Sequence, residues 1–218
     1  MKNQRGIKEG KARRMTGMII NGGMRSINKY NLGRSLWKGM AVPYCLYGSE
    51  ITHYTEGDLM KLEKIQNTIG RWSLGAPRCI AVEAIRGEMG WSTFKERVLK
   101  GKFNFLKKIE GLDAERLVKW ILEEEGAKSS WRKELERWKR RENLAEDWYR
   151  MSVKDVKKRT EENGRDGWRL GMEGKTTLRW YKRKEKPEAV QWHSGDWGSR
   201  LVTKARDRNT RGTGQEQG

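Results

Sequence analysis

The sequence predicts an all-α protein: a multi-helix bundle, then a more extended helical region, then a disordered C-terminal tail. Only 3 of the 218 residues are proline, which removes a helical hydrogen-bond donor and clashes with the preceding turn. The 25 glycines exceed the average of about 7% and are expected to separate the helices. Apolar residues recur at spacings of three and four after Ser/Thr-x-x-Asp/Glu pairs, which are typical of helix starts: Thr55 with Asp58, Thr93 with Glu96, and Ser152 with Asp155.

The charge is strongly basic and unevenly placed. The chain carries 48 basic and 29 acidic residues, a net charge of +19. Residues 1–30 hold eight basic and one acidic side chain, whereas residues 31–131 hold 16 and 13. A balanced middle between basic ends is typical of a folded scaffold whose flanks attract polyanions. The expected partner is therefore nucleic acid, as RNA, DNA or an RNA–DNA hybrid, in preference to an anionic membrane surface.

The sequence gives no support for a metal-binding, disulfide-stabilised or membrane-spanning protein. Cys45 and Cys79 are the only cysteines and His53 and His193 the only histidines, and no zinc-type spacing joins them. We expect no metal and no cofactor, and two buried free thiols. No run of 18 apolar residues occurs, so no membrane span is expected, and we place the protein inside the cell, in the nucleus.

Five regions follow from the pattern. We expect a disordered N-terminus over 1–10, a helical bundle over 11–78, a further helical region over 79–150, a basic Trp-rich helical segment over 151–206 and a disordered tail over 207–218.

The bundle is the apolar centre of the chain. A first basic helix over 11–30 is interrupted at Gly22-Gly23. Residues 32–47 are apolar on most sides and predict a buried helix that kinks at Pro43. The helix that begins at Thr55 ends at Gly75. The predicted core residues are Leu36, Trp37, Pro43, Tyr47, Leu62, Ile65, Trp72 and Trp91.

Beyond the bundle we expect a short helix over 79–89 and four longer ones. The helix after Thr93 ends at Gly111 and carries Lys95, Lys100, Lys102 and Lys107 on its polar side. The next helix is capped by Asp113, with a buried set of Ala114, Leu117, Val118, Ile121 and Leu122. A helix over 129–149 follows, and the helix after Ser152 is expected to break at Asn163-Gly164.

Tryptophans alternate with cations after residue 165. Trp168, Trp180, Trp192 and Trp197 lie among Arg169, Arg179, Lys182, Arg183, Lys184 and Lys186. Such rings can stack on single-stranded bases. The competing interpretation, which we favour, is that they anchor small helices that have few aliphatic residues.

Four motifs occur in order in the first half of the chain. The first is apolar-apolar-Pro-x-x-Leu-Tyr-Gly-x-Glu over 41–50, followed by Leu-Glu-x-Ile-Gln over 62–66. Leu-Gly-x-Pro over 74–77 and Gly-x-x-Gly-Trp over 87–91 complete the set. With these motifs the sequence resembles the region after the palm in reverse transcriptases of LINE-type (non-LTR) retrotransposons. The resemblance covers about residues 10–125 well and is looser beyond.

The resemblance implies that residues 11–75 correspond to the thumb, which grips the template–primer duplex. Polymerisation also needs a Tyr-x-Asp-Asp carboxylate pair to hold two metal ions, and this sequence has no Asp-Asp. We therefore expect no enzyme activity and no catalytic residues, but a fragment of such a polymerase that contacts phosphates, alone or with the rest of a reverse transcriptase. The expected contact residues are Arg13, Arg14, Arg25, Lys29, Arg34, Arg179, Lys182, Arg183 and Lys184. The alternative is a helical structural or protein-interaction remnant with no selected nucleic-acid function.

Overall fold

The computed structural model describes residues 2–26, 28–113, 115–124, 129–175, 178 and 181–190. All regular secondary structure in these residues is helical, which confirms the all-α prediction. The elements are α1 (Lys2–Gly22), α2 (Lys29–Leu36), the π-helical η1 (Trp37–Ala41), α3 (Val42–Leu46), α4 (Glu56–Leu74), α5 (Val82–Met89), α6 (Phe94–Glu110), α7 (Leu117–Glu124), α8 (Ser130–Arg141), α9 (Val153–Glu173) and the 3₁₀ turn η4 (Tyr181–Arg183). The predicted tail over 207–218 lies outside the described residues.

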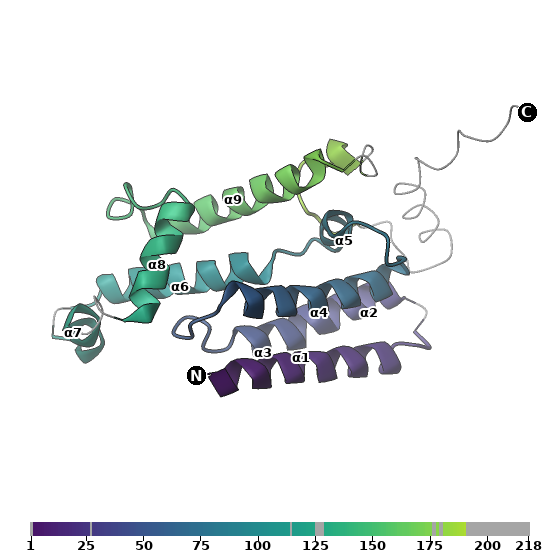
Figure 1. Cartoon of the computed structure of the whole chain (residues 1–218), viewed down its shortest axis with the longest axis horizontal. Helices are drawn as coiled ribbons and strands as arrows, with labels where there is room; N and C mark the ends of the chain where they lie inside the picture. Colours follow the sequence, from purple (N-terminus) through teal and green to yellow (C-terminus); the bar gives the residue numbers. More distant parts are fainter. Residues whose placement is uncertain are drawn as a thin grey trace, which may run out of the picture.

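Two groups of helices make up the molecule (Figure 1). In the first, α1 and α2 pack against α4, and η1 with α3 continues from α2 beside α1. In the second, α6 packs along α9, and α8 crosses the far end of α6. Helix α5 lies between the groups, in contact with both α4 and α9. One cluster of buried apolar residues runs through both groups, from Ala12 in α1 to Tyr181 in η4.

The N-terminal segment is helical, so the prediction of disorder over 1–10 is wrong for residues 2–10. Tertiary contacts order it: Lys8 Nζ donates to the Tyr47 carbonyl at 2.5 Å and to Tyr54 Oη at 2.9 Å. Glu9 pairs with Arg13 at 2.9 Å and, across to α4, with Lys61 at 3.3 Å. The helix ends at Gly22, as the Gly22-Gly23 pair predicts.

The apolar segment 32–47 is buried on one side only. It runs from α2 through the π-helical turn η1 into α3, and Pro43 lies in the first turn of α3, where a missing N–H is tolerated. Trp37 is fully buried, whereas Met40 is 53% and Tyr47 83% exposed. Pro43 is exposed as well. Pro43 and Tyr47 are therefore not core residues, because these three positions, spaced three and four apart, share the face turned away from α1 and α4.

The other predicted core residues are buried in the core or packed against it. Leu62, Ile65 and Trp91 are each no more than 5% exposed, and Leu36 and Trp72 pack, partly buried, against the same cluster. The predicted capping boxes at Thr55 and Ser152 are both formed, and the Thr93 side chain accepts from Glu96 N. Of the two cysteines, Cys45 is buried and Cys79 exposed, so only one of the predicted buried thiols is confirmed.

The carboxyl group of Glu63 joins the two helix groups. It comes from α4 and accepts a hydrogen bond from Phe94 N at the start of α6. Burial raises the pKa of Glu63 to about 7, although the hydrogen bond from Phe94 and the nearby Arg86 and Arg97 act in the opposite direction.

Replacing this carboxyl group should change how stability depends on pH. The pKa of Glu63 is higher in the folded protein than in the unfolded chain, so the folded protein holds a proton that the unfolded chain releases. The stability that this protonation contributes is fully present below about pH 4, decreases as the pH rises and is lost once the pH has passed about 7. Glu63→Gln keeps an acceptor for Phe94 N but does not ionise. We expect urea denaturation to show the variant gaining on the wild type by up to about 3 kcal/mol between about pH 5 and 8. Parallel pH profiles would contradict the raised pKa.

Helix α9 continues through the predicted break at Asn163-Gly164. Gly164 lies where α9 crosses α6, and a Cβ atom there would come within 2.6 Å of Glu96 Cδ. The glycine therefore permits a close approach of two helices and does not end one. Glycine in a helix interior costs roughly 1 kcal/mol, which the packing of α9 on α6 offsets here.

Helix α7 differs most from its prediction. It begins at Leu117, three residues later than a cap at Asp113 implies. Leu117, Val118 and Ile121 are 66%, 51% and 42% exposed, so they are not the buried set that the pattern predicts; Ala114 and the Leu122 side chain lie outside the described part of the chain. Figure 1 shows α7 projecting beyond the end of α6. Within the described segments, no helix combines the length and apolar character that crossing a bilayer requires.

Candidate nucleic-acid interface

Two long segments of the chain contain no acidic residue. Neither residues 10–49 nor residues 64–82 include any Asp or Glu. The first segment supplies most of α1 and all of α2, η1 and α3, and the second supplies the later half of α4 and the turn after it. Because α1 and α2 both pack on α4, the fold places the two segments against each other. Their cations therefore share a surface to which neither segment contributes a carboxylate.

We use the name acid-free surface for five cations of these two segments: Arg14, Arg25, Lys29, Lys64 and Arg78. Lys11, Arg13 and Lys38 of the first segment are exposed as well and are not included in it. Lys29 is half-buried, with Nζ 5.8 Å from the centre of the Trp72 ring, and the other four are exposed. Within the described residues none of the five forms an ion pair, whereas the neighbouring Arg13 and Lys61 are both paired with Glu9. Their charge is therefore available to an external anion.

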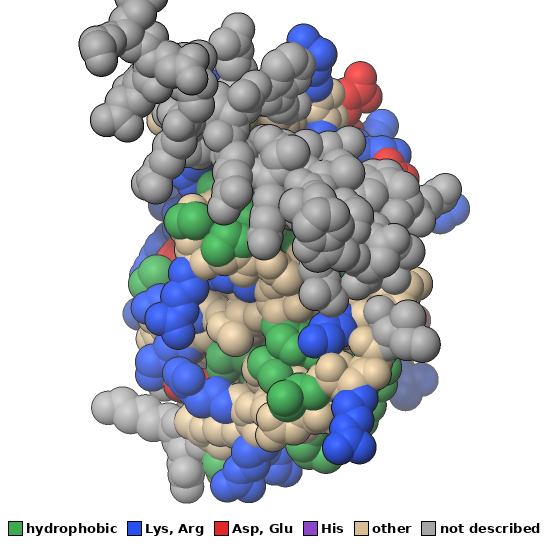
Figure 2. Space-filling view, turned by 90° about the vertical axis from the view of Figure 1, so that its right-hand side faces the viewer, with side chains coloured by type: hydrophobic (Ala, Val, Ile, Leu, Met, Phe, Trp, Pro, Cys, Tyr) green, Lys and Arg blue, Asp and Glu red, His purple; other side chains and the backbone are tan. Residues whose placement is uncertain are grey.

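Part of the acid-free surface, formed by Arg25, Lys29 and Arg78, lies at one end of the bundle, and Arg14 and Lys64 lie farther back, in the middle of α1 and α4. The end of α1, the start of α2 and the end of α4 meet there, at the right of Figure 1. Figure 2 looks at this end directly: blue Lys and Arg side chains surround neutral and apolar ones, and few red side chains are visible below the grey atoms. Gly23 allows the close packing of the turn after α1, since a Cβ atom there would lie 2.5 Å from Trp72 Cη2.

Three of the predicted contact residues belong to this surface: Arg14, Arg25 and Lys29. Arg13 is exposed as well, but Glu9 neutralises it at 2.9 Å. Lys64 and Arg78 belong to the surface and were not predicted. Their signal in the sequence is the absence of acidic residues over 64–82, and it becomes informative only once α4 is known to pack beside α1 and α2.

Two predicted contact residues have a structural role instead. Arg34 Nε donates to the Met89 carbonyl at 3.1 Å, and Lys184 Nζ donates to the Gly87 carbonyl at 2.7 Å. Both carbonyls lie at the C-terminal end of α5, where helix carbonyls lack intrahelical partners and favour cations. These two side chains therefore hold α2 and the segment after η4 against α5.

Two further predicted contact residues, Lys182 and Arg183, belong to η4. Lys182 is exposed and its Nζ donates to the Glu173 carbonyl at 2.8 Å, and Arg183 is exposed. Arg179 lies outside the described residues. The structure thus gathers three of the nine predicted cations on the acid-free surface and places the others elsewhere or leaves them undescribed.

Similarity to known proteins does not decide what this surface binds. No family model, curated protein or solved structure matches the chain. In the described part of the chain, no three His, Cys, Asp or Glu side chains are grouped as metal ligands would be. What the surface can do follows from its own chemistry: exposed guanidinium and ammonium groups without carboxylate partners bind phosphate oxygens through charge-assisted hydrogen bonds.

Proposed function

We propose that this chain is a non-catalytic helical module that binds nucleic acid through backbone phosphates. The observation that carries the proposal is the acid-free surface: five cations, four of them exposed, that form no ion pair within the described residues. Phosphate contacts of this kind are independent of base sequence and release counterions, so binding weakens steeply with salt. The resemblance of residues 10–125 to the thumb region of LINE-type reverse transcriptases points to the same ligand, a template–primer duplex.

A salt titration with two matched variants tests this proposal. The first replaces Arg14, Arg25, Lys64 and Arg78 by Gln. The control replaces Lys154, Lys157, Lys158 and Arg159, four exposed cations of α9, by Gln and so removes the same charge elsewhere. Binding to an RNA–DNA hybrid is measured by fluorescence anisotropy from about 50 to 200 mM salt.

The first variant should lose about 2 to 4 from the slope of log K against log salt, since each phosphate contact on a duplex contributes about 0.9. The control variant should keep the wild-type slope. Equal losses in the two variants would show that total charge, and not this surface, attracts the duplex. A wild-type affinity that does not change with salt would overturn the proposal outright.

A further inference from the structure

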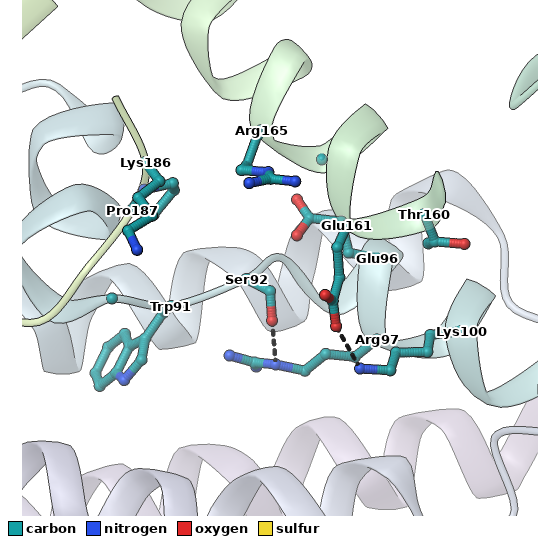
Figure 3. A pocket seen from close by; sticks show the side chains of 12 residues that line it. Trp91, Ser92, Glu96, Arg97, Lys100, Thr160, Glu161, Arg165, Lys186 and Pro187 are labelled. Carbon is teal, nitrogen blue, oxygen red and sulfur yellow. Dashed lines mark hydrogen bonds and ion pairs between the residues drawn. The ribbon is translucent and has the colours of Figure 1, made fainter. Parts of the chain in front are cut away.

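A second cationic site lies away from the acid-free surface, in a cleft between α6 and α9. The cavity has a volume of about 430 Å³, and the segment at Lys186 and Pro187 closes a third side. Figure 3 shows Arg165 projecting from α9 into this space, with Arg97 of α6 along its floor. Trp91 also lines the cleft. Cavities of about 300 to 1,000 Å³ hold small organic ligands, so this one has room for a nucleotide-sized molecule.

The charges that line the cleft do not cancel. Its lining includes four cations and two carboxylates: Arg97, Lys100, Arg165 and Lys186, with Glu96 and Glu161. Both carboxylates already have partners. Glu161 pairs with Lys100 at 2.8 Å, and Glu96 accepts from Arg86 Nη2 at 3.0 Å and from Thr93 Oγ1 at 2.9 Å. In the described residues Arg165 has no ion pair, and Lys186 reaches only the exposed Glu188, at 3.5 Å.

Arg97 is fixed in place by uncharged acceptors. Its Nη1 donates to Gln66 Oε1 at 2.7 Å and its Nε donates to Ser92 Oγ at 3.1 Å. Burial lowers the pKa of Arg97 to about 10, so it stays charged at neutral pH. Two carboxyl groups lie nearby: Glu63, whose pKa of about 7 leaves it only partly ionised at neutral pH, and Glu96, which already accepts hydrogen bonds from Arg86 and Thr93. A positioned guanidinium whose hydrogen-bond acceptors are neutral offers its charge to a ligand at little reorganisation cost.

We propose that this cleft binds the phosphate group of a nucleotide-sized ligand, held between Arg97 and Arg165 with Lys186 at the rim. Pro187 gives the remainder of the ligand an apolar contact at the side of the cleft. The chemistry required is a phosphate monoester or diphosphate, which a free nucleotide and the phosphorylated end of a nucleic-acid strand both provide. The site shares no residue with the acid-free surface, so this proposal can be tested independently of the function proposed above.

The first test is calorimetric titration of the full chain with inorganic pyrophosphate and with adenosine 5′-monophosphate at low salt. We expect saturable binding to the wild type and a loss of about tenfold or more in Arg165→Gln, because a charge-assisted hydrogen bond is removed. Arg159→Gln is the matched control: it removes the same charge from an exposed position of α9 that does not line the cleft. Circular dichroism verifies that both variants fold.

Two outcomes would overturn the assignment. One is the absence of saturable binding of either probe to the wild type, and the other is an equal loss in Arg165→Gln and Arg159→Gln. Oligonucleotides with a 5′-phosphate or a 5′-hydroxyl separate the two sources. A preference for the 5′-phosphate that pyrophosphate and Arg165→Gln both abolish assigns the cleft to a strand end. Pyrophosphate binding without that preference assigns it to a free nucleotide. Both variants retain the acid-free surface, so failure here leaves the salt dependence of duplex binding unchanged.

Discussion

Lys102→Met is expected to lower the free energy of unfolding by about 3 kcal/mol or more. The Lys102 side chain is fully buried, its Nζ lies 3.1 Å from Glu134 Oε2, and burial lowers its pKa. Glu134 is itself only 3% exposed. Removing the lysine leaves a carboxylate in the interior whose other partner is the imidazole of His53. Urea denaturation at neutral pH measures the loss.

Two further variants separate the burial of this pair from a generic loss of charge. Arg141→Met breaks an ion pair of similar geometry, 2.8 Å to Glu56, in which both side chains are more than half exposed. Its cost should stay within about 1 kcal/mol. The double variant Lys102→Met, Glu134→Leu removes both buried charges and should recover most of the stability of the wild type. If Lys102→Met costs no more than Arg141→Met, the lysine is not buried as described.

Lys102 also shows why residue type misled the sequence-based assignment of faces. Lysine is rarely buried unless it is paired, so residue type alone predicts that Lys102 lies on the polar side of its helix. Helical spacing places it differently: Phe94, Val98, Lys102 and Leu106 follow one another at intervals of four and lie on one face, and all four are buried. Its partner, Glu134, is 32 residues away on α8, a pairing that no local pattern indicates.

Local sequence signals predicted where the helices begin and end better than they predicted which side chains are buried. The caps at Thr55, Thr93 and Ser152 and the stops at Gly22 and Gly75 are local hydrogen-bond chemistry, and the structure confirms them. The exposure of Tyr47 and of α7 depends on which helices pack nearby. A helix apolar on several sides is buried only as far as neighbours cover it, and that follows from the tertiary arrangement.

The acid-free surface was partly predictable for the same reason. Arg14, Arg25 and Lys29 lie close together in sequence, so a basic N-terminal region identified them. Lys64 and Arg78 join them only because α4 packs against α1 and α2. The cleft between α6 and α9 was not predictable at all, because Arg97 and Arg165 are far apart in sequence and the pattern predicts a helix break at Asn163-Gly164, within the helix that lines the cleft.

A second large loss of stability is expected when Trp168 is replaced. Its ring is 1% exposed, its Nε1 donates to the Glu83 carbonyl at 2.8 Å, and it meets the Tyr181 ring edge-on with centroids 6.2 Å apart. Trp168→Ala should therefore cost about 3 to 5 kcal/mol of unfolding free energy, as for other buried tryptophans. Trp120→Ala on α7 is the matched control, since that ring is 56% exposed and should cost less than about 1 kcal/mol.

The same residue decides between base stacking and helix anchoring at the one tryptophan of the 165–200 segment that the structure describes. A ring enclosed by α5, α9 and Tyr181 cannot also offer its face to a base, so stacking would require the segment to open. Trp168→Leu keeps an apolar side chain, and binding of single-stranded RNA should be unchanged at a temperature where the variant is folded. A loss of about 1 to 3 kcal/mol of binding free energy in the folded variant would instead establish stacking. Trp180, Trp192 and Trp197 lie outside the described residues, and the same pair of measurements on each extends the distinction to them.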